Sequence, residues 1–348
     1  MKVAIVGAGN IGRVHAEAVL ASTASSLAGI YEPDAARSDA VARALDVRPF
    51  GSLDELLEES AGVFVASPNR THAAHAGAAL RRGKHVLCEK PMAVSVTEAA
   101  EMAGRATTAP GVCGVGFNYR YLEVIQEIRR RIDEGDVGRV LHVSVAFHRR
   151  SALTRKRFTW RDGAAERSTS GALGDLGVHL IDLLHFLFRS PIDTGGCLVG
   201  LQTKVATKEG QEVQVDDHAF VTGGLGTGTH FTLTASKVSA PGDLGLALTV
   251  TGSRAELAYR SQDGPLLRRR KGVVWEELKF LGSDRLDDPP GEVPGWADTF
   301  LAQLNDWTAT AAGRPRSETL AGFEDGYLAQ QVLEALLRQG RESLGLAV

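Results

Sequence analysis

The first 120 residues alternate short, continuously apolar runs with amphipathic stretches of helical length, and this alternation limits the possible folds. The apolar runs predict strands at Lys2–Gly7, Leu27–Tyr31, Val63–Ala66, His85–Cys88 and Val112–Gly116. The stretches between them predict helices at Ile11–Ala24, Ala35–Leu45, Leu53–Glu59, Ala73–Arg82 and Ser95–Arg105. Strands that are apolar on both faces imply a parallel sheet that is covered by helices on both sides.

The pattern changes after about residue 120. Val140–His148 alternates apolar and polar residues, which is typical of an antiparallel strand with one solvated face. Similar strands are predicted at Cys197–Val205, Val213–Thr222, His230–Val238, Leu246–Thr251 and Val273–Leu278, with helices at Leu122–Glu134, Leu173–Phe188, Ala297–Ala312 and Glu324–Arg338. We therefore expect an α/β domain over 1–120 and an α+β domain with a mostly antiparallel sheet over 121–348, whose last helix packs back on the first domain.

The composition is that of a folded protein from a reducing compartment. The chain has 348 residues, 43% of them hydrophobic, and a formal net charge of -3, so no nucleic-acid partner is expected. Its three cysteines lie far apart, without the spacing of a metal site or a disulfide framework, and are expected to be buried. No run of 18 uncharged apolar residues is present. We expect no membrane partner and a cytoplasmic location.

The first predicted strand leads directly into Gly7-Ala8-Gly9-Asn10-Ile11-Gly12, which has the pattern G-x-G-x-x-G. The first glycine of such a turn allows the tight bend, the second lets the backbone approach a pyrophosphate, and the third lets the helix pack on the strand. The helix that follows offers backbone N–H groups and a partial positive charge to phosphates. We therefore expect this turn to bind a dinucleotide.

Glu32 provides the second half of the dinucleotide-binding fingerprint. It ends the second predicted strand, 20 residues after Gly12. A carboxylate there would accept hydrogen bonds from the adenosine ribose and repel a 2′-phosphate, which favours NAD over NADP. Arg37 weakens this preference if it lies close by, so the use of NADP stays open. A solvated loop acid is the alternative interpretation of Glu32.

Lys90 lies in a position where ligands bind in open α/β sheets. It belongs to Glu89-Lys90-Pro91, directly after the strand His85–Cys88, and so lies at the carboxyl end of a parallel strand. A lysine beside a nicotinamide can stabilise a developing alkoxide or relay a proton. Lys90 is therefore a candidate catalytic residue.

A second group of ionisable residues lies in an apolar helix. Asp175, His179 and Asp182 stand at positions i, i+4 and i+7, so a regular helix carries all three on one face. Three buried ionisable groups are costly without partners or a task. Histidine suits general acid–base chemistry near neutral pH, and a carboxylate can orient it. A structural network of satisfied polar groups is the alternative interpretation.

Taken together, these motifs resemble the Gfo/Idh/MocA family of glucose–fructose oxidoreductases, inositol dehydrogenases and rhizopine catabolism proteins. The resemblance covers nearly the whole chain. It rests on Gly7-x-Gly9-x-x-Gly12, Ser67-Pro68-Asn69 with His72, Glu89-Lys90-Pro91, Asn118-Tyr119-Arg120 and Asp175-x-x-x-His179-x-x-Asp182. It implies an N-terminal Rossmann domain and a C-terminal domain with a large open sheet. One face of that sheet would carry the substrate, and the other would form the interface of a homodimer or homotetramer.

The resemblance also implies roles for the site residues. Ser67, Pro68, Asn69 and His72 would line the nicotinamide, Glu89 would contact the cofactor ribose, and the Lys90–Pro91 bond would be cis. Lys90 and His179 would flank the reacting carbon, with Asp175 bonded to substrate or catalytic groups.

The reaction implied by the family is an NAD(P)-dependent hydride transfer between a secondary alcohol of a sugar or cyclitol and the nicotinamide. His179 would exchange the hydroxyl proton, and Lys90 would stabilise the alkoxide. Asn118, Arg120 and Asp182 of the same motifs are candidate substrate-binding residues. The chain departs from many NAD-using relatives in having Glu32 where they have Asp.

Residues 148–167 contain seven arginines or lysines and two acidic residues. This segment precedes the helix of Asp175 and could reach an anionic substrate such as a sugar phosphate or nucleotide sugar. Arg157 and Trp160 are the candidate substrate contacts within it. A solvated loop or an oligomer contact is the alternative interpretation.

A metal site is not expected, because His72-x-x-His75 and Asp182-x-x-His185 lack an obvious third ligand. A non-catalytic regulator that binds a dinucleotide and a protein partner stays open, although Lys90, Asp175 and His179 are all present. An oxidoreductase that recycles a tightly bound cofactor also stays open.

Overall fold

The computed structural model describes residues 1–280 and 285–343, apart from the side chain of Glu166. Within these residues the chain forms two compact units. Among the described residues, the first unit comprises Met1–Tyr121, residues 285–287 and Trp296–Gln330. The second unit comprises residues 122–280, Asp288–Gly295 and residues 331–343. No helix of the described residues is long and apolar enough to cross a membrane.

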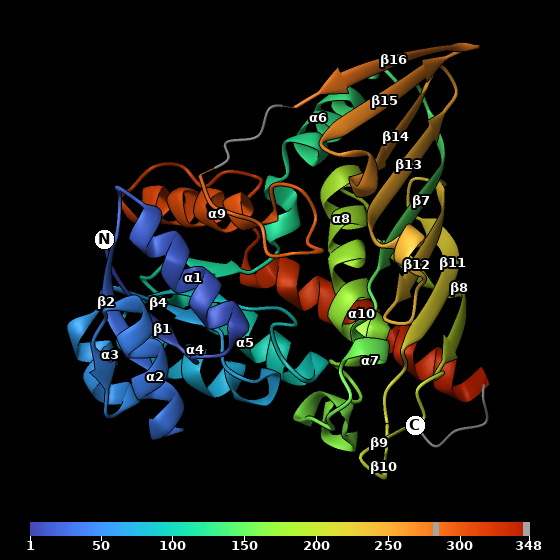
Figure 1. Ribbon diagram of the computed structural model, residues 1–348. Helices are drawn as coiled ribbons and strands as arrows, with labels where there is room; N and C mark the ends of the chain where they lie inside the picture. Colours follow the sequence, from blue (N-terminus) through green and yellow to red (C-terminus); the bar gives the residue numbers. More distant parts are fainter. Residues whose placement is uncertain (281–284, 344–348) are drawn as a thin grey trace. The chain divides into compact units, whose positions relative to one another are not determined.

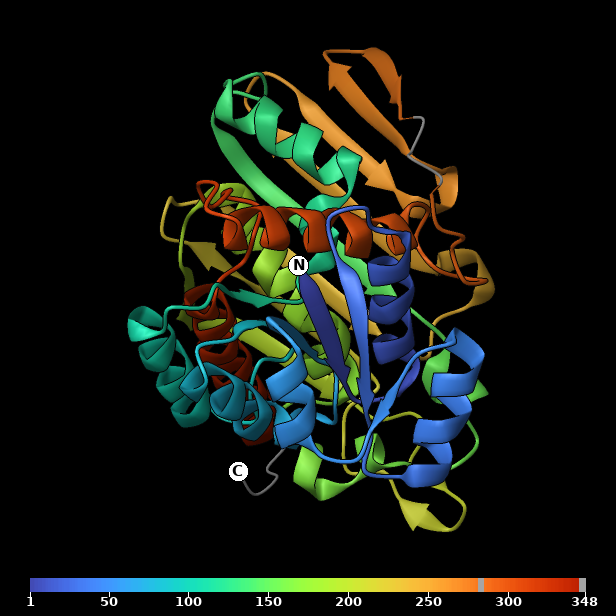
Figure 2. The ribbon, with the colours of Figure 1, turned by 90° about the vertical axis from the view of Figure 1, so that its left-hand side faces the viewer.

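The first unit is built on a parallel sheet in the order β3-β2-β1-β4-β5-β6 (Figure 2). Its strands are β1 Lys2–Val6, β2 Ser26–Tyr31, β3 Pro49–Phe50, β4 Gly62–Val65, β5 His85–Cys88 and β6 Cys113–Val115. Strands β1 and β4 in the centre are almost wholly buried, because helices cover both of their faces. This topology confirms the predicted parallel sheet and places the carboxyl ends of β1, β4 and β5 at one edge.

The helices of this unit begin largely where the sequence predicts. They are α1 Asn10–Ala21, α2 Ala35–Leu45, α3 Leu53–Glu59, α4 His72–Arg81 and α5 Val96–Thr108. Ser52 and Ser95 cap α3 and α5 by accepting hydrogen bonds from the third residue of each helix. The Glu98 side chain accepts from the amide of Val94 (3.2 Å).

A segment from near the end of the chain completes the first unit. Helix α9 (Trp296–Ala311) packs beside α1, as both views of the ribbon show (Figures 1 and 2). Trp307 is fully buried, and its indole N–H donates to the carbonyl of Val112 (3.1 Å). The Gln303 amide donates to the carbonyl of Val115 (2.9 Å). These contacts satisfy carbonyl groups along β6, the outermost strand of the sheet. Helix α10 (Phe323–Ser343) begins in this unit and ends in the second.

The second unit contains an eight-stranded sheet in the order β16-β15-β14-β13-β7-β12-β11-β8 (Figure 1). Its strands are β7 Val140–His148, β8 Ile192–Gln202, β11 His218–Leu225, β12 His230–Ser236, β13 Gly245–Gly252, β14 Glu256–Arg260, β15 Leu266–Lys271 and β16 Val274–Lys279. Helices α6 (Glu123–Asp133) and α8 (Val178–Phe188) pack against each other, and α8 lies against the sheet. A mostly antiparallel sheet in the C-terminal half is confirmed.

Strand β7 differs from its prediction in two respects. It pairs antiparallel with β13 but parallel with β12, with Ser236 opposite His148. Its apolar residues Val143, Val145 and Phe147 are buried under α8 as expected, whereas Leu141 at the start of the strand is 41% exposed. The parallel pair brings the ends of β7 and β12 to the same place, and the candidate site uses both ends.

The predicted strand Val213–Thr222 is wrong in its first half. Gln211–Glu212 forms β10, which pairs with β9 (Thr207–Lys208), and β11 begins only at His218. The physical reason lies in Asp216 and Asp217, whose carboxylates accept backbone N–H groups of other segments. Because the segment up to Asp217 turns to make these hydrogen bonds, it is not part of a strand of the large sheet.

Strands β14 and β15 were not predicted from the sequence. Strand β15 reads Leu-Leu-Arg-Arg-Arg-Lys, a poor strand pattern by itself. Acidic residues pair with its charges: Arg270 with Glu256 of β14, and Arg268 and Arg269 with Glu277 and Glu276 of β16. These partners lie on the neighbouring strands, so the pattern of the segment by itself does not predict the strand.

Candidate active site

The glycine-rich turn between β1 and α1 has the close backbone packing that its motif predicts. Gly7 has a φ of +104°, and a Cβ there would lie 2.6 Å from the carbonyl oxygen of Ala66. A Cβ on Gly12 would collide with the carbonyl oxygen of Gly7. No described atom lies within 4 Å of where a Cβ on Gly9 would stand. The first amides of α1 therefore begin beside open space, which fits a pyrophosphate, and this turn would hold NAD.

Glu32 follows β2 and reaches the same turn. Its Oε2 accepts a hydrogen bond from the backbone N–H of Ala8 (3.0 Å), so the carboxylate lies directly beside the glycine-rich loop. This is the placement that a ribose-binding acid needs. The guanidinium of Arg37 lies 3.6 Å from Oε1. Arg37 is thus close enough to offset part of the repulsion between Glu32 and a 2′-phosphate.

Glu89 forms a buried pair with His15, a residue that the sequence analysis missed. The Nε2 of His15 lies 2.7 Å from Oε1 of Glu89, and both side chains are less than 10% exposed. Burial raises the pKa of Glu89, but the hydrogen bond and charge of His15, together with Lys90, lower it by more. Its pKa therefore lies below the usual range. The other carboxylate oxygen accepts the backbone N–H of Lys90 (3.2 Å) and so helps to fix that residue.

Two histidines shape the backbone around the predicted nicotinamide segment. The ring nitrogens of His72 lie 2.9 Å from the carbonyl oxygen of Pro91 and 2.8 Å from that of Ser67. The Ser67 hydroxyl bonds to Nδ1 of His75 (2.9 Å). The Lys90–Pro91 peptide bond is cis, as the family resemblance implies. His72 is fully buried and thus ties together the two chain segments that carry Ser67 and Lys90.

Asn118 and Arg120, predicted to bind substrate, are buried and make contacts inside the first unit. The Asn118 amide donates to the hydroxyl of Thr299 (2.8 Å), and Arg120 pairs with Asp325 (3.1 Å). Their partners come from the part of the chain that returns to this unit after residue 295. These contacts connect the segment that follows β6 to helices α9 and α10.

In the second unit, the predicted continuous helix over 173–188 begins instead with a π-helical turn, Leu173–Gly177, which leads into α8. Its glycines explain the geometry. A Cβ on Gly171 would collide with the carboxylate of Asp216, and one on Gly174 would lie 2.5 Å from the backbone carbon of Thr169. The wide turn is thus pressed against neighbouring backbone. Turns of this kind are frequent at functional sites.

The start of the π turn is held by Asp216, which the sequence analysis also missed. Its Oδ2 accepts the backbone N–H groups of Ala172 (2.9 Å) and Leu173 (2.8 Å). A carboxylate at this point satisfies N–H groups that have no partner within the helix. Burial raises the pKa of Asp216, and the Leu173 bond and the charge of Lys237 oppose the rise without cancelling it.

Asp175 lies within the π turn and is paired with Lys237. The two charged groups are 2.9 Å apart, with the lysine side chain 7% exposed and the aspartate 34% exposed. Lys237 directly follows β12, far along the chain from Asp175. No sequence spacing could have signalled this partner.

His179 and Asp182 lie on α8 and are both buried. The imidazole of His179 meets the ring of Phe147 edge to face, at 6.2 Å between ring centroids. Phe147 is the last inward-facing residue of β7, so His179 lies near the end of that strand. The structure thus brings His179 and Asp175 to the strand ends of β7 and β12, where Lys237 also lies.

Some of the basic residues of the segment 148–167 have partners within the second unit. Arg149 pairs with Glu292, Arg155 and Lys208 both pair with Asp162, and Arg161 lies over the ring of Trp160 at 4.2 Å. One face of Trp160 is therefore already covered. Lys156 and Arg157 are exposed, and among the described residues neither forms an ion pair.

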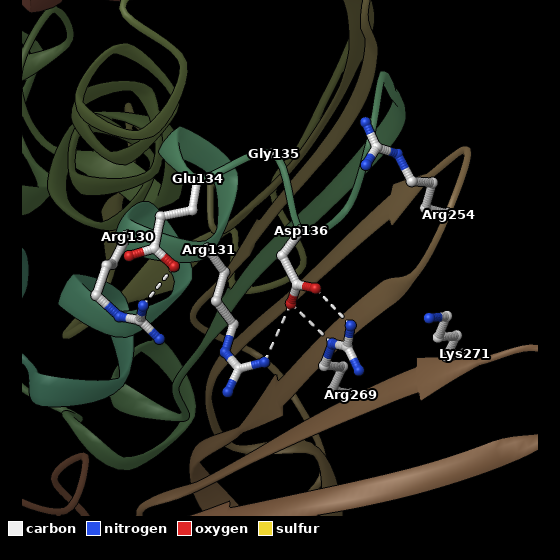
Figure 3. A pocket seen from close by; sticks show the side chains of 8 residues that line it. All are labelled: Arg130, Arg131, Glu134, Gly135, Asp136, Arg254, Arg269 and Lys271. Atoms are coloured by element: carbon white, nitrogen blue, oxygen red, sulfur yellow. Dashed lines mark hydrogen bonds and ion pairs between the residues drawn. The ribbon is translucent and has the colours of Figure 1, made fainter.

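The second unit also contains a hollow of about 440 Å³ outside this site (Figure 3). Asp136 lies there between the guanidinium groups of Arg131 and Arg269, which ties the end of α6 to β15. Arg254 and Lys271 line the same hollow. Most of its charge is paired, so we interpret the hollow as a structural ion-pair network. No group of three or more His, Cys, Asp or Glu residues in the described chain could hold a metal.

Comparison with known proteins covers both halves of the chain. Residues 1–117 match the family described as "Oxidoreductase family, NAD-binding Rossmann fold", and residues 129–348 match "Oxidoreductase family, C-terminal alpha/beta domain", the two parts of the GFO_IDH_MocA family. The chain is 37% identical over 347 residues to glucose-6-phosphate 3-dehydrogenase of Bacillus subtilis (strain 168), covering 100% of this chain and 98% of that protein.

Other relatives are similar to part of this chain, and solved structures share its fold. UDP-N-acetylglucosamine 3-dehydrogenase of Acidithiobacillus ferrooxidans is 36% identical over 130 residues, or 37% of this chain and 41% of that protein. An oxidoreductase domain protein from Kribbella flavida superimposes with a TM-score of 0.87 at 27% identity, over 98% of this chain and 97% of the other. Levoglucosan dehydrogenase in complex with NADH and levoglucosan has the same fold, with a TM-score of 0.87 at 21% identity and the same coverage.

The tight packing of the π turn leads to a prediction. Gly174→Ala should lower turnover at least tenfold, because the new Cβ would press on the backbone of Thr169 and displace the turn that carries Asp175. Steady-state kinetics and thermal melting of the purified variant measure this.

Gly104→Ala in α5 is the matched control, since no described atom lies within 4 Å of the added Cβ. It should keep full turnover and gain about 0.5–1 kcal/mol in stability from the better helix former. Equal kinetics for the two variants would show that the π turn tolerates a side chain.

Proposed function

We propose that this chain is an NAD-dependent dehydrogenase that acts on a secondary hydroxyl group of a sugar or sugar phosphate, because it belongs to the Gfo/Idh/MocA family of oxidoreductases. The observation that carries the proposal is the 37% identity to a sugar-phosphate dehydrogenase over the whole chain, in a sequence that has Lys90, Asp175 and His179. The family resemblance, the fold class and the NAD-binding first domain expected from the sequence are confirmed.

We assign dinucleotide binding to residues 1–120 and substrate binding to residues 121–348. The turn Gly7–Gly12 would hold the pyrophosphate, Glu32 the adenosine ribose and Glu89 the other ribose. The hydrogen bond from Ala8 to Glu32 and the open space beside Gly9 support this assignment. When bound, the nicotinamide ring of NAD supplies the hydride acceptor. NAD is favoured over NADP, with Arg37 able to soften the preference.

The chemistry required of the protein is proton transfer and charge stabilisation. As the carbinol C–H bond breaks and its hydride leaves, the hydroxyl proton goes to the imidazole of His179, and the product is a ketone. The ammonium of Lys90 stabilises the developing alkoxide. In the reverse direction His179 returns the proton to the oxygen. Asp175 orients the substrate and favours the protonated imidazole.

Two alternatives from the sequence are weighed against this proposal. A non-catalytic regulator needs no proton-transfer groups, so the presence of Lys90, Asp175 and His179 favours an enzyme. An oxidoreductase that recycles a bound cofactor between two sugars would use the same residues. The absorbance spectrum of the freshly purified protein distinguishes this case, because bound NADH absorbs in the near ultraviolet.

A phosphorylated substrate is supported by Lys156 and Arg157. Arg149, Arg155 and Arg161 of the segment have acidic or aromatic partners, whereas Lys156 and Arg157 are exposed and form no ion pair with the described residues. Cations of this kind suit a phosphate group.

We further propose a cytoplasmic homo-oligomer joined through the outer face of the large sheet. Leu198 of β8 and Phe220 of β11 are exposed, and Leu198 shares a face with Thr222 and Thr232 in register. Small residues and two exposed apolar ones suit sheet packing. Sedimentation of the intact chain should give a dimer or tetramer, and a monomer at all concentrations would contradict the assignment.

The catalytic assignment predicts that Lys90→Ala and His179→Ala each lower turnover by a factor of about 10² or more, since each removes a group used in proton transfer or charge stabilisation. NAD binding, measured by calorimetry, should persist in both. Lys84→Ala and His230→Ala are the matched controls and should keep full turnover. Wild-type turnover in both catalytic variants would contradict the assignment.

The phosphate assignment predicts a selective loss. In the double variant K156A/R157A, KM for glucose 6-phosphate should rise about tenfold, as expected when charged hydrogen bonds are lost, while KM for glucose stays unchanged. The double variant R254A/K271A removes the same charge from the hollow of Figure 3 and should leave both values unchanged. An equal rise for both sugars, or for both double variants, would refute a phosphate contact.

A further inference from the structure

We propose that Lys237 is a positioning residue that holds Asp175 as an oriented, ionised carboxylate at the start of the helix that carries His179. This inference rests on the proposed dehydrogenase function and adds a residue to its machinery. Neither the motifs of the sequence nor the family comparison points to Lys237. The contacts of its backbone and its ammonium group do.

The backbone of Lys237 is fixed on both sides. Its N–H donates to the carbonyl of Asp217 (2.8 Å), and its own carbonyl accepts the N–H of Ala152 (3.0 Å). The residue directly follows β12, which pairs with a strand on each side and whose last residue, Ser236, lies opposite His148 of β7. Lys237 therefore starts from a rigid point and has little freedom to move as a whole.

The ammonium group of Lys237 forms an ion pair with the carboxylate of Asp175. Its Nζ lies 2.9 Å from Oδ2 of Asp175, and its side chain is only 7% exposed. Lysine is rarely buried to this extent unless it is paired, because removal of the charge from water is costly. The Asp175 side chain is 34% exposed, so the pair lies where the protein interior meets solvent. The lysine is thus anchored inside, and the aspartate presents its outer side to the site.

Within the second unit, the charge of Lys237 acts on two carboxylates, those of Asp175 and Asp216. Asp216, before β11, interacts electrostatically with Lys237 while it caps the π turn that contains Asp175. The carboxylate of the neighbouring Asp217 accepts the backbone N–H groups of Lys204 and Val205. His179 lies on the next helical turn.

Two further histidines lie near the strand ends but on the other side of the sheet. Phe147 faces His179, so His148, the next residue along the strand, faces outward. Ala219 is fully buried, so His218 before it also faces outward. His148 and His218 therefore face away from Asp175. Of the titratable groups in this unit, Lys237 pairs with Asp175 directly, and Asp216 interacts electrostatically with Lys237.

The sign of the effect follows from electrostatics. A cation beside a carboxylate favours its ionised form and lowers its pKa, and removal of that cation raises the pKa. If catalysis needs ionised Asp175, turnover falls as the pH is lowered through the pKa of Asp175. In the variant this fall should occur at a higher pH than in the wild type. Asp175 that is no longer tethered should also orient the substrate less well, which lowers kcat more than it changes KM for NAD.

The experiment compares Lys237→Gln, Lys237→Arg and Lys208→Gln with the wild type. Lys208→Gln is the matched control, because Lys208 is equally buried and pairs with Asp162 (2.8 Å) rather than with Asp175. Lys237→Gln should lower kcat at least tenfold and move the acid limb of the kcat/KM profile up by about one pH unit. Lys237→Arg keeps the charge and should retain most of the turnover and the original limb. Lys208→Gln should lower the melting temperature and leave the limb in place.

A second measurement does not depend on turnover. Carboxyl ¹³C resonances of labelled aspartate, with Asp175 assigned through Asp175→Asn, give its titration directly in the wild type and in the Lys237 variants. Asp175 should titrate at a higher pH in Lys237→Gln than in the wild type. If this shift is observed but the wild-type protein reduces no NAD, the proposed function is refuted and the assignment of Lys237 is still supported.

The assignment of Lys237 is overturned by any of three results. These are an unchanged titration of Asp175 in Lys237→Gln, an equal shift in Lys208→Gln, or loss of activity in Lys237→Arg as complete as in Lys237→Gln. If Lys237→Gln does not fold, Lys237→Met, which keeps the length of the side chain without its charge, takes its place in both measurements.

Discussion

Close approach of one backbone segment to another is the constraint on which both candidate ligand-binding regions depend. At the N-terminal turn, α1 crosses so near to β1 that a side chain on Gly12 would collide with the carbonyl of Gly7. At the π turn, Gly171 and Gly174 meet Asp216 and Thr169 in the same way. In each unit this contact directs functional groups toward a strand end: the amides of α1 in the first unit and Asp175 in the second.

Buried charge is the second theme, and the structure pairs it in each unit. His15 and Glu89 pair beside Lys90, and Lys237 and Asp175 pair ahead of His179. A buried ion pair costs desolvation energy, so such pairs add little to stability by themselves. Their role is to orient side chains. Glu89 is held next to Lys90, and Asp175 is held one helical turn before His179. This explains why polar groups are concentrated at the strand ends although the neighbouring core is apolar.

Local patterns in the sequence predicted the parts of the structure that depend on local interactions. The glycine turn, Glu32 beside it, the serine caps of α3 and α5 and the alternation of β7 were all recognisable because their partners lie within a few residues or follow a known spacing. Lys237 and Asp216 were missed because they reach Asp175 and the π turn from more than 40 residues away in the chain. The arginine-rich strand β15 was missed because its acidic partners lie on other strands. The return of α9 to the first unit depends on hydrogen bonds from Gln303 and Trp307 that no periodicity reveals.

The central claim is that this chain moves a hydride from a sugar carbon to NAD, and isotope transfer tests it most directly. Glucose 6-phosphate that carries deuterium at its secondary carbinol carbons is incubated with the protein and NAD, and the recovered NADH is examined by NMR. We predict one deuterium at carbon 4 of the nicotinamide and a ketone at the sugar carbon that lost it. NADH without deuterium, with the deuterium released to water, would contradict direct hydride transfer.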